Sequence, residues 1–431
     1  MLPIIAIVGR PNVGKSTLFN RLTKTKNAIT GKLPGLTRDR QYGVGKIGEK
    51  PYIVIDTGGF TTAKEGIELL MNEQVQLAMQ EANAILFVTD ARTGLTPVDQ
   101  KIAANLRKLN KTIYLTANKV DGLDVDEALT DFYQLGFTVY PIAAEHNFGI
   151  TALTDAMLSQ LPVAEPSAET DRIKVAFIGR PNVGKSTLIN RILGENRVLT
   201  YNAPGTTRDS IFINFDRQQH QYTLIDTAGI RRRVKITDEF EKFSVVKALQ
   251  AIEQAQVVVV ILDAAEDITD QDLKLIGFVI DCGKALVIAV NKWDGLDNYK
   301  RNIWREELPW RLAFADFIKV HFISALHGTG VGNLFTSINR AYRAAYKIIA
   351  TAKVNKLLEQ ITANNPPPLA RGKFIKLRYA HIGGHAPPVI IIHGARAKST
   401  PANYRKYLIN SFREKLNLFG TPLIVEFKDE K

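Results

Sequence analysis

The chain has 431 residues, which is too long for one ordinary domain and suits two or three. Its hydrophobic share of 45% and charged share of 23% exclude disordered and fibrous proteins. The longest apolar runs, such as Val257–Leu262, are far shorter than the roughly 20 residues that span a bilayer, so we expect no membrane association. No basic segment precedes the first apolar run, and a lone cysteine, Cys282, can form no internal disulfide. These features predict a cytoplasmic protein.

The positive charge is concentrated at one end of the chain. The net charge is +13, and residues 346–431 carry 15 Lys and Arg against 5 Asp and Glu. Residues 1–165 are balanced, with 17 of each sign. Such a basic block favours a polyanion such as nucleic acid, because binding releases condensed counterions. A solvated basic face without a partner is the alternative.

The chain repeats itself. GRPNVGKSTL occurs at Gly9–Leu18 and again at Gly179–Leu188, an offset of 170 residues. Three shorter motifs recur at an offset of 170 or 173: PGLTRD and PGTTRD, DTGG and DTAG, NKVD and NKWD. A period this long indicates duplicated domains and not a solenoid.

Each copy alternates short apolar runs with helical patterns. Continuous apolar strands separated by helices predict a parallel sheet covered on both faces. The predicted fold is therefore α/β, with two doubly wound P-loop domains in tandem, whose ligands lie at the carboxyl ends of the strands. The predicted strands are Ile4–Val8, Tyr52–Ile55, Ala84–Thr89 and Thr112–Thr116, then Val175–Ile178, Tyr222–Ile225, Val257–Leu262 and Ala285–Val290.

We place the first domain at residues 1–161 and the second at 172–345. Residues 162–171, rich in Pro, Ala, Ser and Glu, read as a flexible linker. The basic block, 346–431, has an α-β-β-α-β order that is typical of a KH-like α+β unit, with its Gly383-Gly384 pair between strands. Its predicted elements are helix Lys347–Ile361, strands Lys373–Tyr379 and Val389–His393, helix Tyr404–Leu416 and strand Leu423–Phe427.

GRPNVGKS fits the phosphate-binding pattern G-x-x-x-x-G-K-[ST] between a strand and a helix. Its backbone N–H groups and the helix N-terminus form an anion site. Lys15 and Lys185 would neutralise phosphate charge, and Ser16 and Ser186 would offer a hydroxyl to Mg²⁺. A chance glycine-rich turn is the alternative, which two copies in this context disfavour. The other predicted contacts are Gly9, Arg10, Pro11, Asn12, Val13, Gly14 and Thr17, then Gly179, Arg180, Pro181, Asn182, Val183, Gly184 and Thr187.

Asp56 and Asp226 each follow an apolar strand, where a carboxylate can hold Mg²⁺ through water. The glycines that close the motif, Gly59 and Gly229, can offer an N–H to the terminal phosphate. Alone the motif could be a plain turn, but behind a phosphate loop it predicts a γ-phosphate contact. The neighbouring predicted contacts are Thr57, Gly58, Phe60, Thr227, Ala228 and Ile230.

The NKxD motifs predict which nucleotide base is bound. The carboxylates of Asp121 and Asp294 can accept two hydrogen bonds from guanine, whereas adenine would leave them unpaired. A helix-capping Asp is the alternative. Ser324 and Ala325 lie in the last of the predicted nucleotide-binding loops of the second copy. The first copy has alanine in place of the serine, so we expect an altered nucleotide affinity there. The other predicted contacts are Asn118, Lys119, Val120, Asn291, Lys292 and Trp293.

With these motifs the chain resembles the EngA family, also called Der: bacterial GTPases with two tandem G domains and a KH-like domain. The resemblance implies binding of GTP and GDP, Mg²⁺, GTP hydrolysis and a role in assembly of the large (50S) ribosomal subunit. It implies the large subunit or its precursor and ribosomal RNA as partners. By the same resemblance, Thr37 and Thr207 are switch I threonines that close on Mg²⁺ and the γ-phosphate. We expect a monomer when the protein is free.

Hydrolysis is expected to be slow without help, because Phe60 and Ile230 stand where Ras-like GTPases carry a water-orienting glutamine. In similar translation-factor-related GTPases, an asparagine in the phosphate loop binds potassium. Asn12 and Asn182 therefore suggest K⁺-stimulated turnover; holding the loop by a hydrogen bond is the alternative. We assign the catalytic role to Lys15, Lys185, Thr37, Thr207, Gly59 and Gly229.

Other interpretations remain open. A tRNA-modifying GTPase resembling TrmE would have one G domain and a cysteine-bearing partner region. An RNA-binding scaffold with one inactive G domain is a second alternative, and competition by ATP would indicate a kinase. Arg231–Arg233 are hypothesised to meet RNA phosphate or another domain in one nucleotide state, with a solvated charge run as the alternative. No GXXG loop stands between two helices of the basic block, so we expect RNA contact through charge or shape.

Overall fold

The computed structural model divides the chain into two compact units, Met1–Ser167 and Ala168–Lys431. The division falls within the predicted linker, and the second unit contains both the second G domain and the basic domain. None of the helices in the described part of the chain has the length and apolar character needed to cross a membrane. The structure describes residues 2–24, 41–57, 76, 78–80, 82–161, 172–194, 212–217, 219–225, 245–369 and 372–430.

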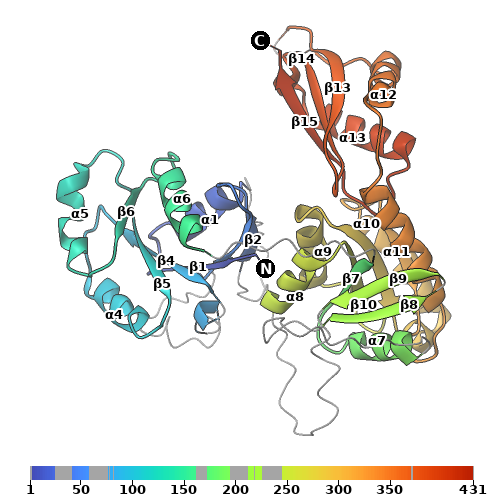
Figure 1. The fold of residues 1–431 in the computed structure, drawn as a ribbon, viewed down its shortest axis with the longest axis horizontal. Coiled ribbons are helices and arrows are strands. Elements are labelled where there is room, and N and C mark those ends of the chain that lie inside the picture. The colour runs from blue at the N-terminus through green and yellow to red at the C-terminus, as the bar shows by residue number, and fades with distance from the viewer. Residues whose placement is uncertain are drawn as a thin grey trace, which may run out of the picture. The chain divides into compact units, whose positions relative to one another are not determined.

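The first unit is a six-stranded sheet with helices on both faces (Figure 1). The strand order is β2-β3-β1-β4-β5-β6, and every pairing is parallel except that of β2 with β3. The strands are β1 Ile4–Val8, β2 Gln41–Gly45, β3 Tyr52–Asp56, β4 Ala84–Asp90, β5 Thr112–Asn118 and β6 Val139–Ile142. The helices are α1 Lys15–Thr23, α4 Pro97–Leu106, α5 Val125–Tyr133 and α6 Ile150–Gln160.

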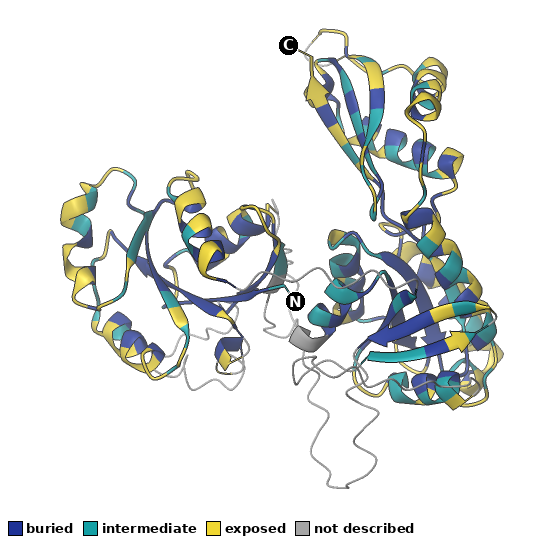
Figure 2. Ribbon diagram, in the orientation of Figure 1, coloured by how far each residue is buried: buried dark blue, intermediate teal, exposed yellow. Residues whose placement is uncertain are grey.

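The three central strands of this unit, β1, β3 and β4, are buried along their whole length (Figure 2). Apolar side chains of α1 and α6, such as Leu18 and Leu153, share one core cluster with alternate strand residues such as Ile5. The paired strands end on polar residues, since Asp90 lies opposite Asn118 in the β4–β5 register. The sheet therefore collects polar side chains along its carboxyl edge.

The second G domain repeats this arrangement. Its strand order is β12-β11-β10-β7-β9-β8, with β8 antiparallel to β9 and the remaining pairings parallel. The strands are β7 Ile173–Ile178, β8 Phe212–Arg217, β9 His220–Ile225, β10 Val257–Asp263, β11 Ala285–Asn291 and β12 Lys319–Phe322. The helices are α7 Lys185–Gly194, α8 Val245–Gln254, α9 Asp270–Asp281, η3 Trp293–Gly295, α10 Asn298–Arg311 and α11 Val331–Ala345.

These sheets confirm the predicted α/β class and add one feature that the apolar pattern did not predict. The expected sheet is fully parallel, but each observed sheet has an antiparallel edge strand, β2 or β8. In β8 only one residue, Phe215, is buried, so the strand lacks the continuous apolar run by which the buried strands are recognised. A half-exposed edge strand gives a weaker sequence signal.

The basic domain has the predicted α-β-β-α-β order, with both helices on one face of a three-stranded sheet (Figure 1). β13 pairs antiparallel with β14, and β14 pairs parallel with β15. One detail of the prediction was wrong: Gly383 and Gly384 belong to β13, where Gly384 pairs with Val389, and do not lie between strands. The elements are α12 Thr351–Asn364, β13 Lys376–Gly384, β14 Val389–Ala395, η4 Ala397–Ser399, α13 Ala402–Leu416 and β15 Ile424–Asp429.

The loop after α13 attaches the basic domain to the second G domain. The Gly420 N–H donates to the Phe317 carbonyl at 2.9 Å, and the Leu286 N–H donates to the Gly420 carbonyl at 2.7 Å. Gly420 has a φ of 67°, and a Cβ there would lie 2.7 Å from the Ala341 Cβ. Only glycine fits this conformation and this close approach. The two domains therefore meet through backbone hydrogen bonds within one compact unit.

Candidate nucleotide-binding sites

In both copies the GRPNVGKS loop joins a buried strand to a helix that begins at its lysine, Lys15 or Lys185. Gly14 and Gly184 have φ values of 96° and 93°. A Cβ at Gly14 would lie 2.3 Å from the Nδ2 of Asn118, and the corresponding distance in the second copy is the same. Glycine is thus required for the loop to approach the base-recognition motif. Each loop leads into a helix N-terminus, which favours bound anions.

Lys15 lies across the first loop. Its Nζ donates to the carbonyls of Gly9 at 2.8 Å and Arg10 at 2.7 Å, and the residue is only 4% exposed. Burial lowers the pKa of Lys15 to about 8, against an opposing influence of Asp56. Lys185 makes the same contacts, to Gly179 and Arg180. Both amines are therefore held beside the loop, and bound phosphate would raise the pKa of Lys15.

The residues present in the first copy fit a magnesium ion. The Ser16 hydroxyl donates to the Asp56 carboxylate at 2.8 Å, so two hard oxygen donors meet at the start of α1. Such oxygens suit Mg²⁺, which keeps several waters and binds through one or two protein groups plus phosphate. Asp56 itself is 1% exposed at the end of β3.

A single asparagine connects the loops of each copy. The Asn118 Nδ2 donates to the Val13 carbonyl at 2.8 Å, while its Oδ1 accepts from the Ala144 N–H at 3.0 Å. Asn291 makes the same two hydrogen bonds, each of 2.8 Å, to Val183 and Ala325. Both asparagines are 2% exposed. The phosphate loop, the NKxD motif and the last loop are therefore held together by one buried side chain.

An aspartate that was not among the predicted site residues binds the lysine of each NKxD motif. The Lys119 Nζ donates to Asp90 at 2.7 Å and to the Asn12 carbonyl at 2.9 Å. Lys292 pairs with Asp263 in the same way, and the two pairs have the same sequence separation of 29 residues. This shared separation, with each Asp at the end of an apolar strand, is the signal that could have revealed both residues.

The two base-recognition carboxylates share a histidine neighbour, His146 for Asp121 at 3.8 Å and His327 for Asp294 at 3.3 Å, but differ in their other partners. In the first copy Asp121 forms an ion pair with Arg92, which also donates to the Asp121 carbonyl at 3.1 Å. In the second copy Ala265 occupies the corresponding position. There a hydrogen bond with Ser324 lowers the pKa of Asp294, with the charges of His327 and Arg301 acting in the same direction. Guanine would therefore compete with Arg92 for Asp121, but not with an equivalent arginine for Asp294.

The last loop keeps the same backbone role in both copies despite the alanine for serine exchange. Ala144 and Ala325 each give their N–H to the NKxD asparagine. Their carbonyls accept hydrogen bonds from the Nε atoms of Arg21 at 2.7 Å and Arg191 at 3.2 Å. These arginines, which belong to no predicted motif, connect the helix after the phosphate loop to the last loop.

The arginines of the phosphate loops turn toward protein carboxylates. The Arg10 Nε lies 3.4 Å from Asp99, and the Arg180 Nε lies 2.9 Å from Asp272. Both aspartates cap helices, α4 and α9, by accepting from the backbone of Thr96 and Thr269. These arginine side chains anchor the loop to the protein, so Arg10 and Arg180 would meet phosphate through their backbone N–H groups.

Several predicted site residues lie outside the described residues. They are Thr37, Gly58, Gly59 and Phe60 in the first copy, and Thr207, Asp226, Thr227, Ala228, Gly229 and Ile230 in the second, together with Arg231–Arg233.

A duplicated P-loop fold with an NKxD motif beside each loop defines a tandem-G-domain, GTP-binding protein. A family model described as a 50S ribosome-binding GTPase matches residues 4–119 and 174–292. A second, described as the C-terminal KH-domain-like region of EngA bacterial GTPase enzymes, matches residues 349–428. These matches are consistent with the resemblance stated from the motifs.

Close relatives cover almost the whole chain. GTPase Der of Legionella pneumophila (strain Corby) is 55% identical over 430 residues, covering 99% of this chain and 93% of its own. GTPase Der of Thioalkalivibrio sulfidiphilus is 54% identical over 433 residues, with coverage of 99% and 93%. That of Klebsiella pneumoniae is 50% identical over 461 residues, with coverage of 100% and 94%. The chain belongs to the Der (EngA) family and is a GTPase, which confirms the resemblance.

Proposed function

We propose that this GTPase is a nucleotide-driven switch in assembly of the large ribosomal subunit, and that it binds ribosomal RNA or a pre-ribosomal particle. The observation that carries the proposal is the joining of two G domains to a block with 15 basic and 5 acidic residues. The matching family model is described as ribosome-binding, which supports the same partner. The proposed partner would place the protein in the cytoplasm, as a monomer until it binds.

Mg²⁺ would supply charge neutralisation between the β- and γ-phosphates when it is bound. The Ser16 hydroxyl and the Asp56 carboxylate, which touch at 2.8 Å, are the proposed holders in the first copy. In the second copy Ser186 and Asp226 are proposed for this role, with Thr37 and Thr207 added from switch I. Lys15 and Lys185 orient and neutralise the phosphates from the loop.

K⁺ is proposed as a second ion. Asn12 and Asn182 have φ values of 66° and 63°, a left-handed conformation that asparagine tolerates better than most residues. Both are exposed at the mouth of the phosphate loop, where an amide oxygen could contribute to a K⁺ site. The ion would replace the charge that an arginine finger supplies elsewhere.

The switch works through differential affinity. GTP can shift the balance between two domain arrangements only as far as it binds one arrangement better than the other. The γ-phosphate contacts proposed for Thr37, Thr207, Gly59 and Gly229 would supply that difference. The basic domain would then present its RNA-binding surface in one nucleotide state.

Sedimentation with purified ribosomal subunits tests this function. The protein is mixed with small and large subunits in GDP, in a non-hydrolysable GTP analogue, or without nucleotide. We expect co-migration with large subunits in the analogue alone. Equal co-migration in all three conditions would favour a passive scaffold, and so would co-migration in the analogue that Lys15→Ala and Lys185→Ala leave unchanged. No co-migration with either subunit would contradict the proposal.

A further inference from the structure

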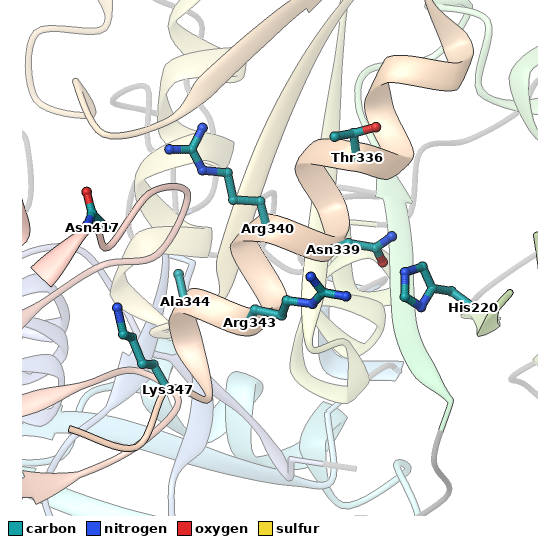
Figure 3. Close-up of a pocket in the computed structure, with 8 residues that line it drawn as sticks. All are labelled: His220, Thr336, Asn339, Arg340, Arg343, Ala344, Lys347 and Asn417. Carbon is teal, nitrogen blue, oxygen red and sulfur yellow. The ribbon is translucent and has the colours of Figure 1, made fainter. Parts of the chain in front are cut away.

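A basic cleft of about 620 Å³ lies where the second G domain meets the basic domain. Its wall is the exposed side of α11, with the first residue of β9 on one side and the loop after α13 on the other (Figure 3). The lining residues are His220, Thr336, Asn339, Arg340, Arg343, Ala344, Lys347 and Asn417.

The cleft holds three permanent positive charges. None of the residues that line it is acidic. Within the described part of the chain, Arg340, Arg343 and Lys347 form no ion pair with a carboxylate. Two acidic residues of the second G domain, Asp216 and Asp316, are paired with Arg172 and Arg413 instead. Among the described residues, therefore, no carboxylate is ion-paired with the cations of the cleft.

Contacts with neighbouring groups hold two of these cations in place. The Arg340 guanidinium lies 3.8 Å from the centroid of the Phe419 ring, and the Lys347 Nζ donates to the Leu416 carbonyl at 2.9 Å. Asn339 accepts a hydrogen bond of 2.9 Å from the Tyr222 hydroxyl, which fixes its amide. The cleft is thus pre-organised by both domains, and little side-chain entropy would be lost on binding.

The cations follow one another in sequence along the cleft. Arg340 and Arg343 lie one turn apart on α11, and Lys347 lies just beyond the end of that helix at Ala345. A nucleic-acid strand carries one negative charge per nucleotide, so a strand in the cleft can present several phosphates to these cations. The like charges of Arg340 and Arg343 disfavour the end of α11, a cost that a bound polyanion would remove.

We propose that this cleft binds the sugar–phosphate backbone of single-stranded RNA. The three cations neutralise phosphates of the strand, while Asn339, Thr336 and Asn417 supply neutral polar groups for sugar hydroxyls and phosphate oxygens. The cleft holds no GXXG loop, and its contacts are to the backbone, so binding is independent of sequence. The proposal rests on the proposed function as an RNA-binding switch and names the surface that performs it.

The test is RNA binding by the full chain with the cleft neutralised. Fluorescein-labelled oligouridylate of 20 nucleotides is titrated with wild-type protein and with the triple variant Arg340→Gln/Arg343→Gln/Lys347→Gln at several NaCl concentrations. The matched control, Lys300→Gln/Arg311→Gln/Lys319→Gln, removes the same charge from exposed positions of the second G domain, away from the cleft lining. Because Arg340 also contacts Phe419 and Lys347 donates to the Leu416 carbonyl, Arg343→Gln alone is measured as well, with GTP turnover and melting temperature as checks of folding.

We expect the triple variant to bind at least about tenfold more weakly at 0.1 M NaCl, with a log–log salt slope reduced by about 2. Arg343→Gln should reduce the slope by about 0.7, and the control should match wild type. Equal affinities of wild type and the triple variant, or an equal loss in the control, would contradict RNA binding in the cleft but would not contradict the proposed function. No binding by the wild type would instead contradict the proposed function.

Competition identifies the ligand class. Unlabelled oligouridylate should displace the probe at far lower phosphate concentration than sodium tripolyphosphate, and poly-glutamate should displace it poorly. Displacement by tripolyphosphate at equal phosphate concentration would overturn the RNA assignment in favour of a small polyphosphate. Displacement by poly-glutamate at equal charge would overturn it in favour of an acidic protein segment.

Discussion

Asn118 donates a hydrogen bond of 2.8 Å from its side chain to the carbonyl of Val13. This bond crosses from the base-recognition motif to the phosphate loop, and Asn291 repeats it with Val183. The bonds lie beneath the loops, where burial makes an unsatisfied partner costly. Phosphate binding and base recognition are therefore mechanically linked in each pocket.

Removal of this link should weaken nucleotide binding. Asn291→Ala leaves the Val183 carbonyl and the Ala325 N–H without their partner, at about 1–3 kcal/mol for each buried group. We expect at least about tenfold weaker binding of GDP at the second pocket. All three tryptophans, including Trp293 of the NKWD motif, lie in the second G domain. Energy transfer from them to a methylanthraniloyl GDP, with the first pocket disabled by Lys15→Ala, measures this loss.

The control for this prediction is Asn118→Ala in the same background. It removes the equivalent link from the first copy only and should leave the tryptophan signal unchanged. Unaltered affinity in Asn291→Ala would show that the loops are held in place without the asparagine.

Nucleotide binding to the first pocket should take up protons near pH 8. The pKa of Lys15 is about 8 in the free protein because the amine is buried, so the amine is about half protonated at that pH. Phosphates raise the pKa, and binding therefore draws about half a proton from solution. Affinity should be greatest below pH 8 and fall as the pH rises through 8. Calorimetry of a Lys185→Ala variant in two buffers of different ionisation enthalpy measures the uptake. Proton release, or none, would contradict the prediction.

Removing the arginine beside Asp121 and adding one at the corresponding position of the second copy should change the affinity for GDP in opposite directions. Arg92 pairs with Asp121, so Arg92→Ala frees that carboxylate for guanine. The Arg92 side chain is 53% exposed, and exposed ion pairs contribute about 0–1 kcal/mol, so the gain should be at most about fivefold. Ala265→Arg should weaken binding at the second pocket by a similar factor. Competition titrations with GDP check both variants, and weaker binding by Arg92→Ala would instead show that the arginine contacts the nucleotide.

The repeated motifs predicted the class of the fold and the position of each phosphate loop between a strand and a helix, because phosphate loops and buried parallel strands have strong local signals. Residues outside a motif were missed. Arg92 pairs with Asp121 across 29 residues, and no periodicity reveals such an ion pair. Gly383 and Gly384 were placed between strands because glycine pairs usually mark turns, yet the pairing of Gly384 with Val389 extends β13. Tertiary pairing overrode the local preference.

Potassium dependence is tested by comparing GTP turnover in KCl and NaCl. We expect faster turnover in KCl if Asn12 and Asn182 supply an ion ligand. Asn182→Gly keeps the left-handed backbone, where φ is 63°, but removes the amide oxygen and should abolish the stimulation at the second pocket. Asn182→Asp retains an oxygen and should preserve part of it. Equal turnover of the wild type in both salts would rule out the ion site.

The central claim is that one chain carries two guanine-specific pockets built on the same plan. Titration calorimetry of the full chain with GDP and Mg²⁺ tests it most directly. We expect two molecules of GDP bound per chain, falling to one in Lys15→Ala or Lys185→Ala, and no heat from ATP. A stoichiometry of one in the wild type, or displacement of GDP by ATP, would contradict it.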